Sequence, residues 1–292
     1  MNRFLALCHI AETGSFSKTA EEMGYSQSAV SQMIRSLENE FEMALLLRSH
    51  NGAELTHEGK ELLPLIRATV NSYRAVAEKT KELKGMSSGE IRIGTMSSVS
   101  NFWLPKMIKE FKKQYPNVSF TLNQGEYTSI AQWVRSGEVD FGFANLDAVK
   151  DLAKIPLYTD EMMAVLPEEH PLSRLKDIPL RDLAAEPYIR LEEGVFSEPV
   201  NAFGEMGLEP NTRLCVYDDY TVLAMIEEGL GYSVIPAMNL RRHNYRVSVH
   251  SLIPKITRNL GLIYRNTASI PPMSRLFIRY ISDSFFSEFI SE

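Results

Sequence analysis

The 292-residue chain is longer than a typical domain of about 100–200 residues, so we expect more than one hydrophobic core. Its 44% apolar and 23% charged residues are ordinary for a folded globular protein and exclude a disordered or fibrous architecture. The formal net charge of −6 excludes indiscriminate nucleic-acid binding, which depends on neutralising many phosphates. Any binding of DNA must therefore be local.

Membrane, metal and disulfide signals are missing from the sequence. No window approaches the ~18 consecutive apolar residues of a membrane-spanning helix, and the first residues do not form an apolar signal core. We therefore expect a cytoplasmic protein without membrane contact. Cys8 and Cys215 are far apart and are predicted to be small buried hydrophobes. The six histidines make no pair at metal-ligand spacing, so we predict no metal and no cofactor.

Residues 1–60 are predicted to form short helices separated by turns. The first helix ends near Thr13, before Gly14. Ser17 is predicted to cap a second helix that ends at Gly24, and Ser26 to cap a third. The tight connection between the second and third helices is typical of a helix-turn-helix.

The third predicted helix has two distinct faces. Its apolar stripe comprises Val30, Met33, Ile34, Leu37 and Phe41. Its other face carries groups of the kind that contact base edges and phosphates, namely Gln27, Ser28, Ser31, Gln32 and Arg35. The alternative is an ordinary solvated helix face. The segments Leu45–Arg48 and Ala53–Thr56 flank an Asn-Gly turn, which predicts a hairpin, or wing. We expect Arg48, Asn51 and Thr56 to contact the DNA backbone.

A dense set of residues in this region resembles the amino-terminal domain of LysR-type transcriptional regulators. The matching positions are Gly14-Ser15-Phe16-Ser17, Ala20, Ser26 to Gln32, Leu37-Glu38, Leu45, Arg48, Leu55-Thr56 and Gly59. The chain departs from the family at Glu42, where glycine is usual, and at Leu46, where phenylalanine is usual. The resemblance implies a dimeric or tetrameric regulator that binds double-stranded DNA and a small-molecule effector, with RNA polymerase as a further partner.

The head, residues 1–60, is acidic. Five lysines and arginines stand against eight glutamates, a net charge of −3. Because Glu38, Glu40 and Glu42 lie at the far end of the third helix, they need not block its amino end from the groove. We expect modest affinity that depends strongly on salt.

Residues from Thr56 to about Lys84 are predicted to form one long helix. Apolar residues alternate steps of three and four, at Leu63, Ile66, Val70, Tyr73 and Ala77. This seam predicts a dimerisation helix, and the alternative is packing within the same chain. We divide the chain into a winged head (1–60), a linker helix and hinge (61–89) and an effector-binding domain (90–292).

After the Gly- and Ser-containing segment 85–89, predicted strands alternate with helices. This βαβ pattern favours an α/β domain of the doubly wound type. The pattern repeats from near Glu161, with crossing strands near residues 160 and 262, which resembles the two-lobed effector domain of the same family. We assign lobe I to about 90–160 and 266–292, and lobe II to about 161–265.

Ligands collect at the carboxyl ends of parallel strands, so we expect an effector cleft between the lobes. The candidate residues are Ser97, Ser98, Thr128, Asn145, Arg190, Tyr220 and Thr221. A helix amino terminus with one arginine could bind a small carboxylate. Helix capping is the alternative role for Ser97, Ser98 and Thr128, and a surface or inter-lobe salt bridge the alternative for Arg190.

Two other classes of function compete with the regulator. Residues 90–292 alone would suit a solute-binding protein, but the attached helix-turn-helix argues against that class. An enzyme with a regulatory head is the second alternative. The sequence has no nucleophile elbow, no phosphate-binding glycine loop and no acid pair at a recognisable spacing, so we predict that the protein is not an enzyme.

Overall fold

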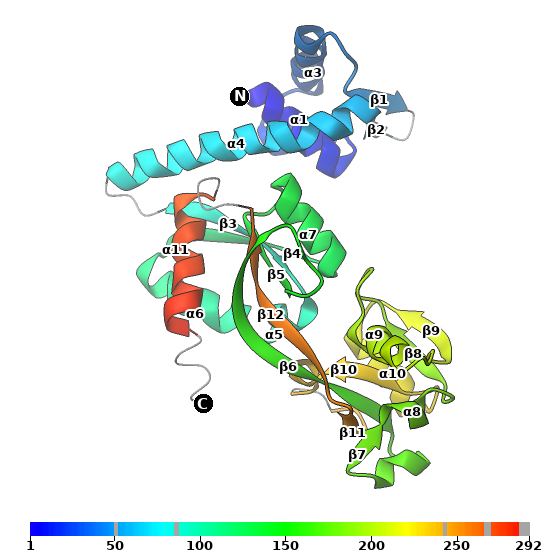
Figure 1. Cartoon of the computed structure of the whole chain (residues 1–292). Coiled ribbons are helices and arrows are strands. Elements are labelled where there is room, and N and C mark those ends of the chain that lie inside the picture. The colour runs from blue at the N-terminus through cyan, green and yellow to red at the C-terminus, as the bar shows by residue number, and fades with distance from the viewer. Residues whose placement is uncertain (50–51, 85–87, 242–243, 266–269, 286–292) are drawn as a thin grey trace.

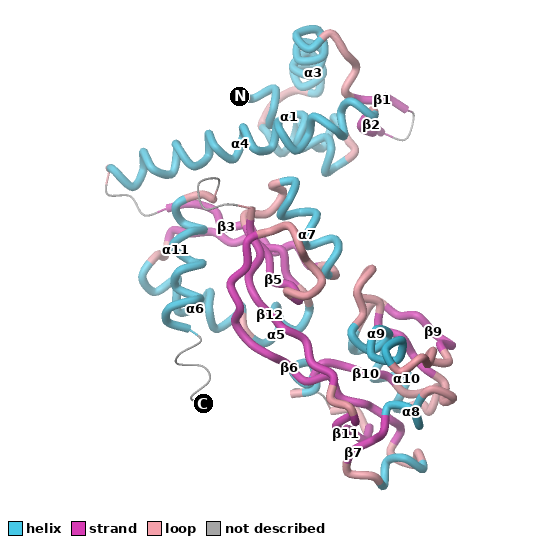
Figure 2. The backbone as a smooth tube through the Cα atoms, viewed as in Figure 1, coloured by secondary structure: helices cyan, strands magenta, loops and turns pink. Residues whose placement is uncertain are grey.

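The computed structural model describes residues 1–49, 52–84, 88–241, 244–265 and 270–285. A helical head lies at one end, a long helix runs between the head and the first lobe of an α/β domain, and two long strands continue into the second lobe (Figure 1). The backbone view shows that the head is helical apart from one two-stranded hairpin (Figure 2). The three parts follow the chain in order.

The head contains the three predicted helices. They are α1 (Asn2–Thr13), α2 (Phe16–Met23) and α3 (Gln27–Phe41). Gly14 and Gly24 end the first two in the left-handed conformation that glycine adopts without strain. The predicted cap Ser26 is confirmed, because its Oγ accepts from the backbone N–H of Ala29 at 3.2 Å. The cap of α2 is Ser15 instead of Ser17, since the helix begins earlier than predicted.

The hairpin pairs β1 (Leu46–Ser49) with β2 (Gly52–Leu55) in antiparallel register. Asn51 lies outside the described residues, as does the side chain of Arg48. The wing rests on the head, because Ala53 N–H donates to the carbonyl of Gly14 at 2.8 Å. The core beneath it is made by fully buried side chains, among them Leu7, Ile10, Val30, Ile34, Leu37 and Leu45.

Helix α4 (His57–Leu83) has 27 residues, or about 40 Å at 1.5 Å per residue. The predicted seam does not form a single face for a partner. Leu63 and Ile66 are buried in the head's own core and Val70 packs against it, whereas Tyr73 is 56% exposed. The first half of α4 therefore packs within its own chain, which was the alternative to dimerisation, because it covers the core of the head. The large apolar side chains left exposed on α4 are Leu65, Tyr73, Val76 and Leu83.

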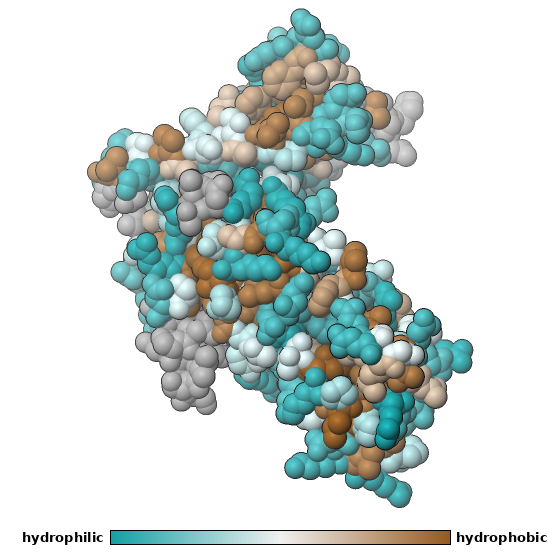
Figure 3. Space-filling model, viewed as in Figure 1, coloured by the Kyte–Doolittle hydropathy of each residue, from teal (hydrophilic) through white to brown (hydrophobic). Residues whose placement is uncertain are grey.

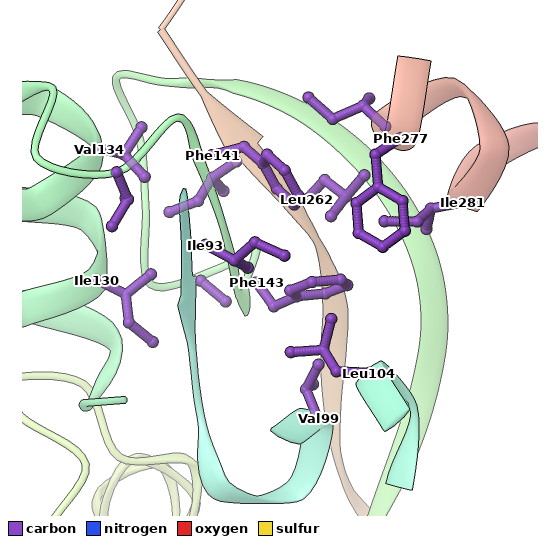
Figure 4. Close-up of a cluster of buried hydrophobic side chains, with 14 of the residues drawn as sticks. Ile93, Val99, Leu104, Ile130, Val134, Phe141, Phe143, Leu262, Phe277 and Ile281 are labelled. Carbon is purple, nitrogen blue, oxygen red and sulfur yellow. The ribbon is translucent and has the colours of Figure 1, made fainter. Parts of the chain in front are cut away.

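Lobe I is built on three parallel strands. They are β3 (Ser88–Thr95), β4 (Asn117–Gln124) and β5 (Phe141–Asn145), so the first strand begins at Ser88, slightly before the predicted Glu90. The helices around them are α5 (Ser97–Phe102), α6 (Leu104–Gln114), α7 (Tyr127–Ser136) and α11 (Pro272–Tyr280), the last followed by a π-helical turn over Ile281–Phe285. Ile130 and Val134 of α7 pack on one side of Ile93 and Phe141, with Phe277 on the other (Figure 4).

Lobe II has smaller elements. Its strands are β7 (Asp177–Pro179), β8 (Tyr188–Leu191), β9 (Thr212–Val216), β10 (Ser233–Pro236) and β11 (Val247–Ile253). Its helices are α8 (Leu180–Leu183), α9 (Glu198–Glu205) and α10 (Asp219–Glu227), with 3-10 turns over Pro171–Arg174 and Ala237–Leu240. Cys215 is exposed, contrary to the prediction, because among the described strands its own strand, β9, pairs with β8 alone and forms an edge.

Two antiparallel strands, β6 (Ala153–Pro167) and β12 (Ile256–Tyr264), pass through both lobes and confirm the predicted crossings. They join the lobes in one eight-stranded mixed sheet of order β4-β3-β5-β12-β6-β11-β7, with β10 paired to β6. The predicted lobe boundary at residue 265 is too late, because Leu260 and Leu262 of β12 already belong to the core of lobe I. The carboxyl ends of β3 and β8 consequently face the junction between the lobes.

Candidate functional site

The polar face of α3 is open to solvent. Val30, Ile34 and Leu37 are fully buried, whereas Gln27, Ser28, Gln32 and Arg35 are exposed and Ser31 is half-buried. The surface of the head at the outer end of α3 is mainly hydrophilic (Figure 3). Such a face, carried on a rigid helix beside a wing, is suited to contact base edges in a groove about 12 Å wide.

Thr56 differs from its predicted role. Its side chain is buried, its Oγ1 donates to the carbonyl of Ala44 at 2.8 Å, and the same oxygen accepts from the N–H of Gly59 at 2.9 Å. The hydroxyl therefore joins the base of the wing to the first turn of α4 and has no exposed donor for a phosphate. We remove Thr56 from the set of DNA-contacting candidates.

Glu42, the departure from the family pattern, ends α3 in the left-handed region with φ 53°. This conformation is strained for a residue with a side chain. Glu38, one turn earlier, accepts the backbone N–H groups of Leu45 and Leu46 at 2.9 and 3.2 Å. One of the acidic residues at the end of α3 thus fixes the entry to the wing.

A cavity of about 450 Å³ lies between the lobes, at the carboxyl ends of β3, β4 and β8. Its polar and charged lining comprises Ser97, Ser98, Gln124, Glu126, Ser129, Glu192, Glu193, Asp219, Asn239 and Arg258. The remaining walls include Met96, Tyr127, Trp133, Leu191 and Tyr217. This is the predicted position of the effector cleft, and its size suits a small molecule.

Only two of the predicted effector residues line this cavity, Ser97 and Ser98. Ser97 Oγ donates to Asp219 Oδ2 across the lobes, and Ser98 Oγ accepts from Arg258 Nη2 at 3.1 Å. Helix α5 thus begins with two hydroxyls that already have partners from lobe II and from β12. Helix capping, the alternative role for these two serines, does not apply, because neither side chain caps α5.

The other predicted residues do not line the cavity. Thr128 Oγ1 accepts from the N–H of Val195, and Asn145 is buried behind the wall, where its Nδ2 donates to Glu198 at 2.7 Å. Arg190 makes the salt bridge named as its alternative, with Glu192. Tyr220 and Thr221 lie on the outer side of the α10 amino end: Tyr220 is 45% exposed, and Thr221 is bonded to the capping Asp218.

The residue at the centre of the cleft, Arg258, was missed. It is 1% exposed and its Nη2 lies 2.8 Å from Oδ2 of Asp160, its cross-strand partner on β6. Burial alone would lower the pKa of Arg258, but the neighbouring Tyr127, Asp160 and Glu193 raise it. The sequence contains only a weak indication of this pair: Asp160 and Arg258 carry opposite charges and lie on the two strands predicted to cross between the lobes.

Acidic side chains gather around this arginine. Glu193 Oε1 lies 4.0 Å from Arg258 Nη1, and Glu198 accepts from the hydroxyl of Tyr127 at 3.0 Å. Burial raises the pKa of Glu193 well above its ordinary range, and the charges of Glu198 and Asp219 raise it further. Across the described ranges, no cluster of His, Cys, Asp and Glu is arranged to hold a metal ion.

A second cavity, of about 440 Å³, lies where α1 and α4 meet lobe I. Arg67 on α4 is 3.0 Å from Glu12 of the head and 3.0 Å from Glu138 of lobe I. Two turns further on, Arg74 lies 2.7 Å from the buried Asp140. Burial would raise the pKa of Asp140, but Arg92 and Arg74 hold it below its ordinary range. The head, the linker helix and lobe I are thus joined by ion pairs.

Two family profiles match the chain. The profile described as "Bacterial regulatory helix-turn-helix protein, lysR family" matches residues 1–60, and "LysR substrate binding domain" matches residues 84–285. A curated relative, the uncharacterized HTH-type transcriptional regulator YvbU of Bacillus subtilis (strain 168), is 32% identical over 96% of each chain. No helix in the part of the chain that the structure describes is long and apolar enough to cross a membrane.

Solved structures share the fold. A full-length OxyR variant from Pseudomonas aeruginosa superposes with a TM-score of 0.76 at 19% identity, covering 97% of this chain and 94% of the other. The effector-binding domain of QuiR in complex with shikimate superposes with a TM-score of 0.60 at 24% identity, covering 67% of this chain and 96% of the other. The match to a full-length protein includes the head, the linker helix and both lobes.

Proposed function

The chain belongs to the LysR family of transcriptional regulators, and we propose that α3 inserts into the major groove of DNA while a small molecule between the lobes controls the binding. The observation that carries the proposal is the pairing of an exposed polar helix face in the head with a cavity between the lobes. The protein would act in the cytoplasm, where its DNA target lies.

For DNA, the proposed contacts to bases come from Gln27, Ser28, Ser31, Gln32 and Arg35. Arg35 is the strongest candidate, because an exposed guanidinium can donate two parallel hydrogen bonds to guanine. Arg48 and Asn51 in the wing stay predictions for the DNA backbone. With a net charge of −3 on the head, few phosphate contacts are available, so two heads on one operator are needed for useful affinity.

For self-association, the exposed apolar residues of α4 support a dimer. Leu65, Tyr73 and Val76 are each more than half exposed, although α4 already packs on the head and lobe I. An antiparallel or parallel partner helix would cover them and hold two heads at a fixed spacing. Assembly of dimers into a tetramer and contact with RNA polymerase stay predictions from the family.

For the effector, the cleft between the lobes supports control by ligand. QuiR, which shares this fold, binds shikimate in its effector-binding domain. A ligand here would change the angle between the lobes, and with it the position of the head joined to lobe I through Arg67. We retain Ser97 and Ser98 as effector contacts and add Asp219, with Arg258 as part of the cavity wall.

The test of DNA recognition is an electrophoretic mobility shift assay on the full chain with an operator selected from random genomic fragments. Arg35→Ala should weaken specific binding by about 1–3 kcal/mol, which is roughly 5- to 150-fold. Arg174→Ala, an exposed arginine in lobe II, is the matched control and should bind like the parent. Affinity of Arg35→Ala within a factor of two of the parent would contradict the proposed role of α3.

A further inference from the structure

We propose that the ligand of the inter-lobe cleft is a small organic cation, an amine or guanidine with an apolar portion, and that Asp219 and Glu193 recognise its charge. This deepens the function proposed above and rests on the cleft being the effector site. It also replaces the small carboxylate that the sequence suggested.

The charges around the cavity do not balance. Its lining contains four carboxyl groups, from Glu126, Glu192, Glu193 and Asp219, and one guanidinium, from Arg258. Burial raises the pKa of Glu193 in the free protein, and a bound cation beside it would favour its ionised form. Two of the four are already occupied: Glu192 pairs with Arg190, and Glu126 caps α7 by accepting from the N–H groups of Thr128 and Ser129. Arg258 is the one cation among the lining residues; it lies 4.0 Å from Glu193, and its closer salt bridge is with Asp160.

Arg258 cannot serve as the anchor for a carboxylate without losing existing partners. Its Nε and one Nη2 hydrogen are directed to Asp160, and its other Nη2 hydrogen to Ser98. Its two Nη1 donors are directed to the hydroxyl of Tyr127 at 3.4 Å and the sulfur of Met96 at 3.7 Å. All five donors of the guanidinium are therefore used within the protein.

The unsatisfied polar atoms of the lining are acceptors. Asp219 is 7% exposed; its Oδ2 accepts from Ser97, but its buried Oδ1 has no hydrogen-bond partner among the described residues. The buried Oδ1 of Asn239, also in the lining, has none within the same ranges. An unpaired buried acceptor destabilises the folded protein by about 1–3 kcal/mol, and by more when the group is charged. A ligand that donates hydrogen bonds would remove this cost, whereas a carboxylate would add to it.

The anion-binding positions at nearby helix ends are filled by the protein itself. The carboxylate of Glu126 sits on the amino terminus of α7, and its Oε1 lies 2.8 Å from the N–H of Ser129. Asp219 likewise takes the hydroxyl of Ser97 at the start of α5. Of the groups that suggested a carboxylate ligand, the Ser97 hydroxyl and the Arg190 guanidinium are thus engaged by carboxylates of this chain.

Aromatic and apolar walls complete a site for an organic cation. Trp133 and Tyr217 line the cavity together with Met96 and Leu191. An indole ring attracts an ammonium or guanidinium group over its face by about 0.5–2 kcal/mol. Because Tyr217 is 81% exposed, it lies at the mouth of the cavity, where an entering ligand meets it first. The cavity thus combines carboxylates with rings that accept an alkyl chain.

The experiment compares three four-carbon probes whose end groups are cationic, neutral and anionic: 1,4-diaminobutane, 1,4-butanediol and succinate. The melting temperature of the full chain is followed by differential scanning fluorimetry in phosphate buffer at fixed ionic strength, because a ligand of the folded state raises it by mass action. We expect a saturable rise with 1,4-diaminobutane and none with the diol or succinate. A larger rise with succinate, or none with the diamine at roughly 1,000 times the protein concentration, would overturn the proposal.

Variants place the probe in the cleft. Asp219→Asn keeps the size of the side chain and should weaken diaminobutane binding at least tenfold by calorimetry; Glu193→Gln serves the same purpose if Asp219→Asn does not fold. Asp182→Asn, an exposed carboxylate on α8, is the matched control and should bind within twofold of the parent. Equal binding by Asp219→Asn and the control would place the diamine elsewhere and refute the assignment.

The cationic ligand and the control of DNA binding by the cleft can be refuted independently. Preference for succinate, with specific DNA binding intact, would refute only the cationic ligand. Binding of diaminobutane that leaves DNA affinity and footprint unchanged would support the charge preference of the cleft but refute its control of DNA binding.

Discussion

Arg67 Nη1 on the linker helix lies 3.0 Å from Oε2 of Glu138 in lobe I, although 71 positions separate the two residues. The other end of the same guanidinium contacts Glu12 of the head at 3.0 Å. With 8% of its side chain exposed, Arg67 is shielded from water, so these pairs are screened less than surface pairs. Head and lobe I are therefore mechanically connected within one chain.

Arg67→Ala should destabilise the folded chain by roughly 2–4 kcal/mol, because it leaves Glu138 beside a cavity without its partner. The free energy of unfolding is measured by urea denaturation. Arg135→Ala is the matched control: its pair with Asp151 is about half exposed on both sides and should cost less than about 1 kcal/mol. Equal losses for the two variants would show that the bridge adds nothing to stability.

Two glycines in helices should respond in opposite directions to alanine. At Gly59, in the first turn of α4, an added Cβ would lie 2.3 Å from the carbonyl oxygen of Leu45. At Gly204 in α9 an added Cβ meets nothing within 4 Å. Gly204→Ala should therefore stabilise by about 0.5–1 kcal/mol through helix propensity, and Gly59→Ala should destabilise by roughly 2 kcal/mol. Urea denaturation measures both, and stabilisation by Gly59→Ala would contradict the close packing of wing and linker.

Glu42→Gly should stabilise the head by about 0.5–1 kcal/mol. Glu42 is exposed and has a left-handed backbone with φ 53°, where glycine avoids the steric cost of a Cβ atom. Thermal denaturation of residues 1–84 would be ambiguous if that fragment did not fold, so the full chain is used. Glu40→Gly, inside α3, is the control and should lower the melting temperature. A lower melting temperature for Glu42→Gly as well would contradict the inference that the backbone of Glu42 is strained.

Glu193→Gln should change the pH dependence of stability. Burial raises the pKa of the folded-state Glu193 carboxyl well above the value of 4.5 expected when unfolded. A raised pKa stabilises the fold below about pH 4.5, and this contribution is lost as the pH rises through the folded-state pKa. The glutamine variant avoids ionisation, so it should be more stable than the parent at pH 8 by about 1 kcal/mol or more, with the advantage shrinking towards about pH 5.

Melting temperatures from about pH 5 to about pH 8.5, in buffers free of amines, check this expectation. Glu169→Gln, an exposed glutamate in the same lobe, controls for the loss of one charge. Parallel curves for Glu193→Gln and the parent would show that Glu193 does not titrate differently in the folded protein.

Much of the head could be predicted because its signals are local. Gly14 and Gly24 stop helices through backbone conformation, and Ser26 caps the next helix three residues away. The error at Ser17 arose because Ser15 offers the same capping hydroxyl two residues earlier. For Leu63 and Ile66 the predicted helical period was correct, but the predicted packing partner was wrong: they enter the core of their own head and not an interface with a second chain. Periodicity shows that a helix face is apolar but not what that face packs against.

The cleft was predictable in position but not in composition. The rule that ligands bind at strand ends placed it correctly beside Ser97 and Ser98. Its charge depends on side chains far apart in sequence, such as Asp160 and Arg258, which are 98 positions apart and meet only through the pairing of β6 with β12. Glu193 lies in a segment without strand or helix periodicity, so nothing local indicated that its half-buried side chain lines the cavity.

The crossing of β6 and β12 has one further consequence. The cross-strand pair of Asp160 and Arg258 belongs to the ribbon that joins the lobes, and its arginine is also part of the wall of the cavity. A change in the twist of this ribbon would therefore move Arg258 and alter the wall of the cavity. If a ligand of the cavity controls DNA binding as proposed, a substitution that stiffens the ribbon should change ligand affinity and the response on DNA together.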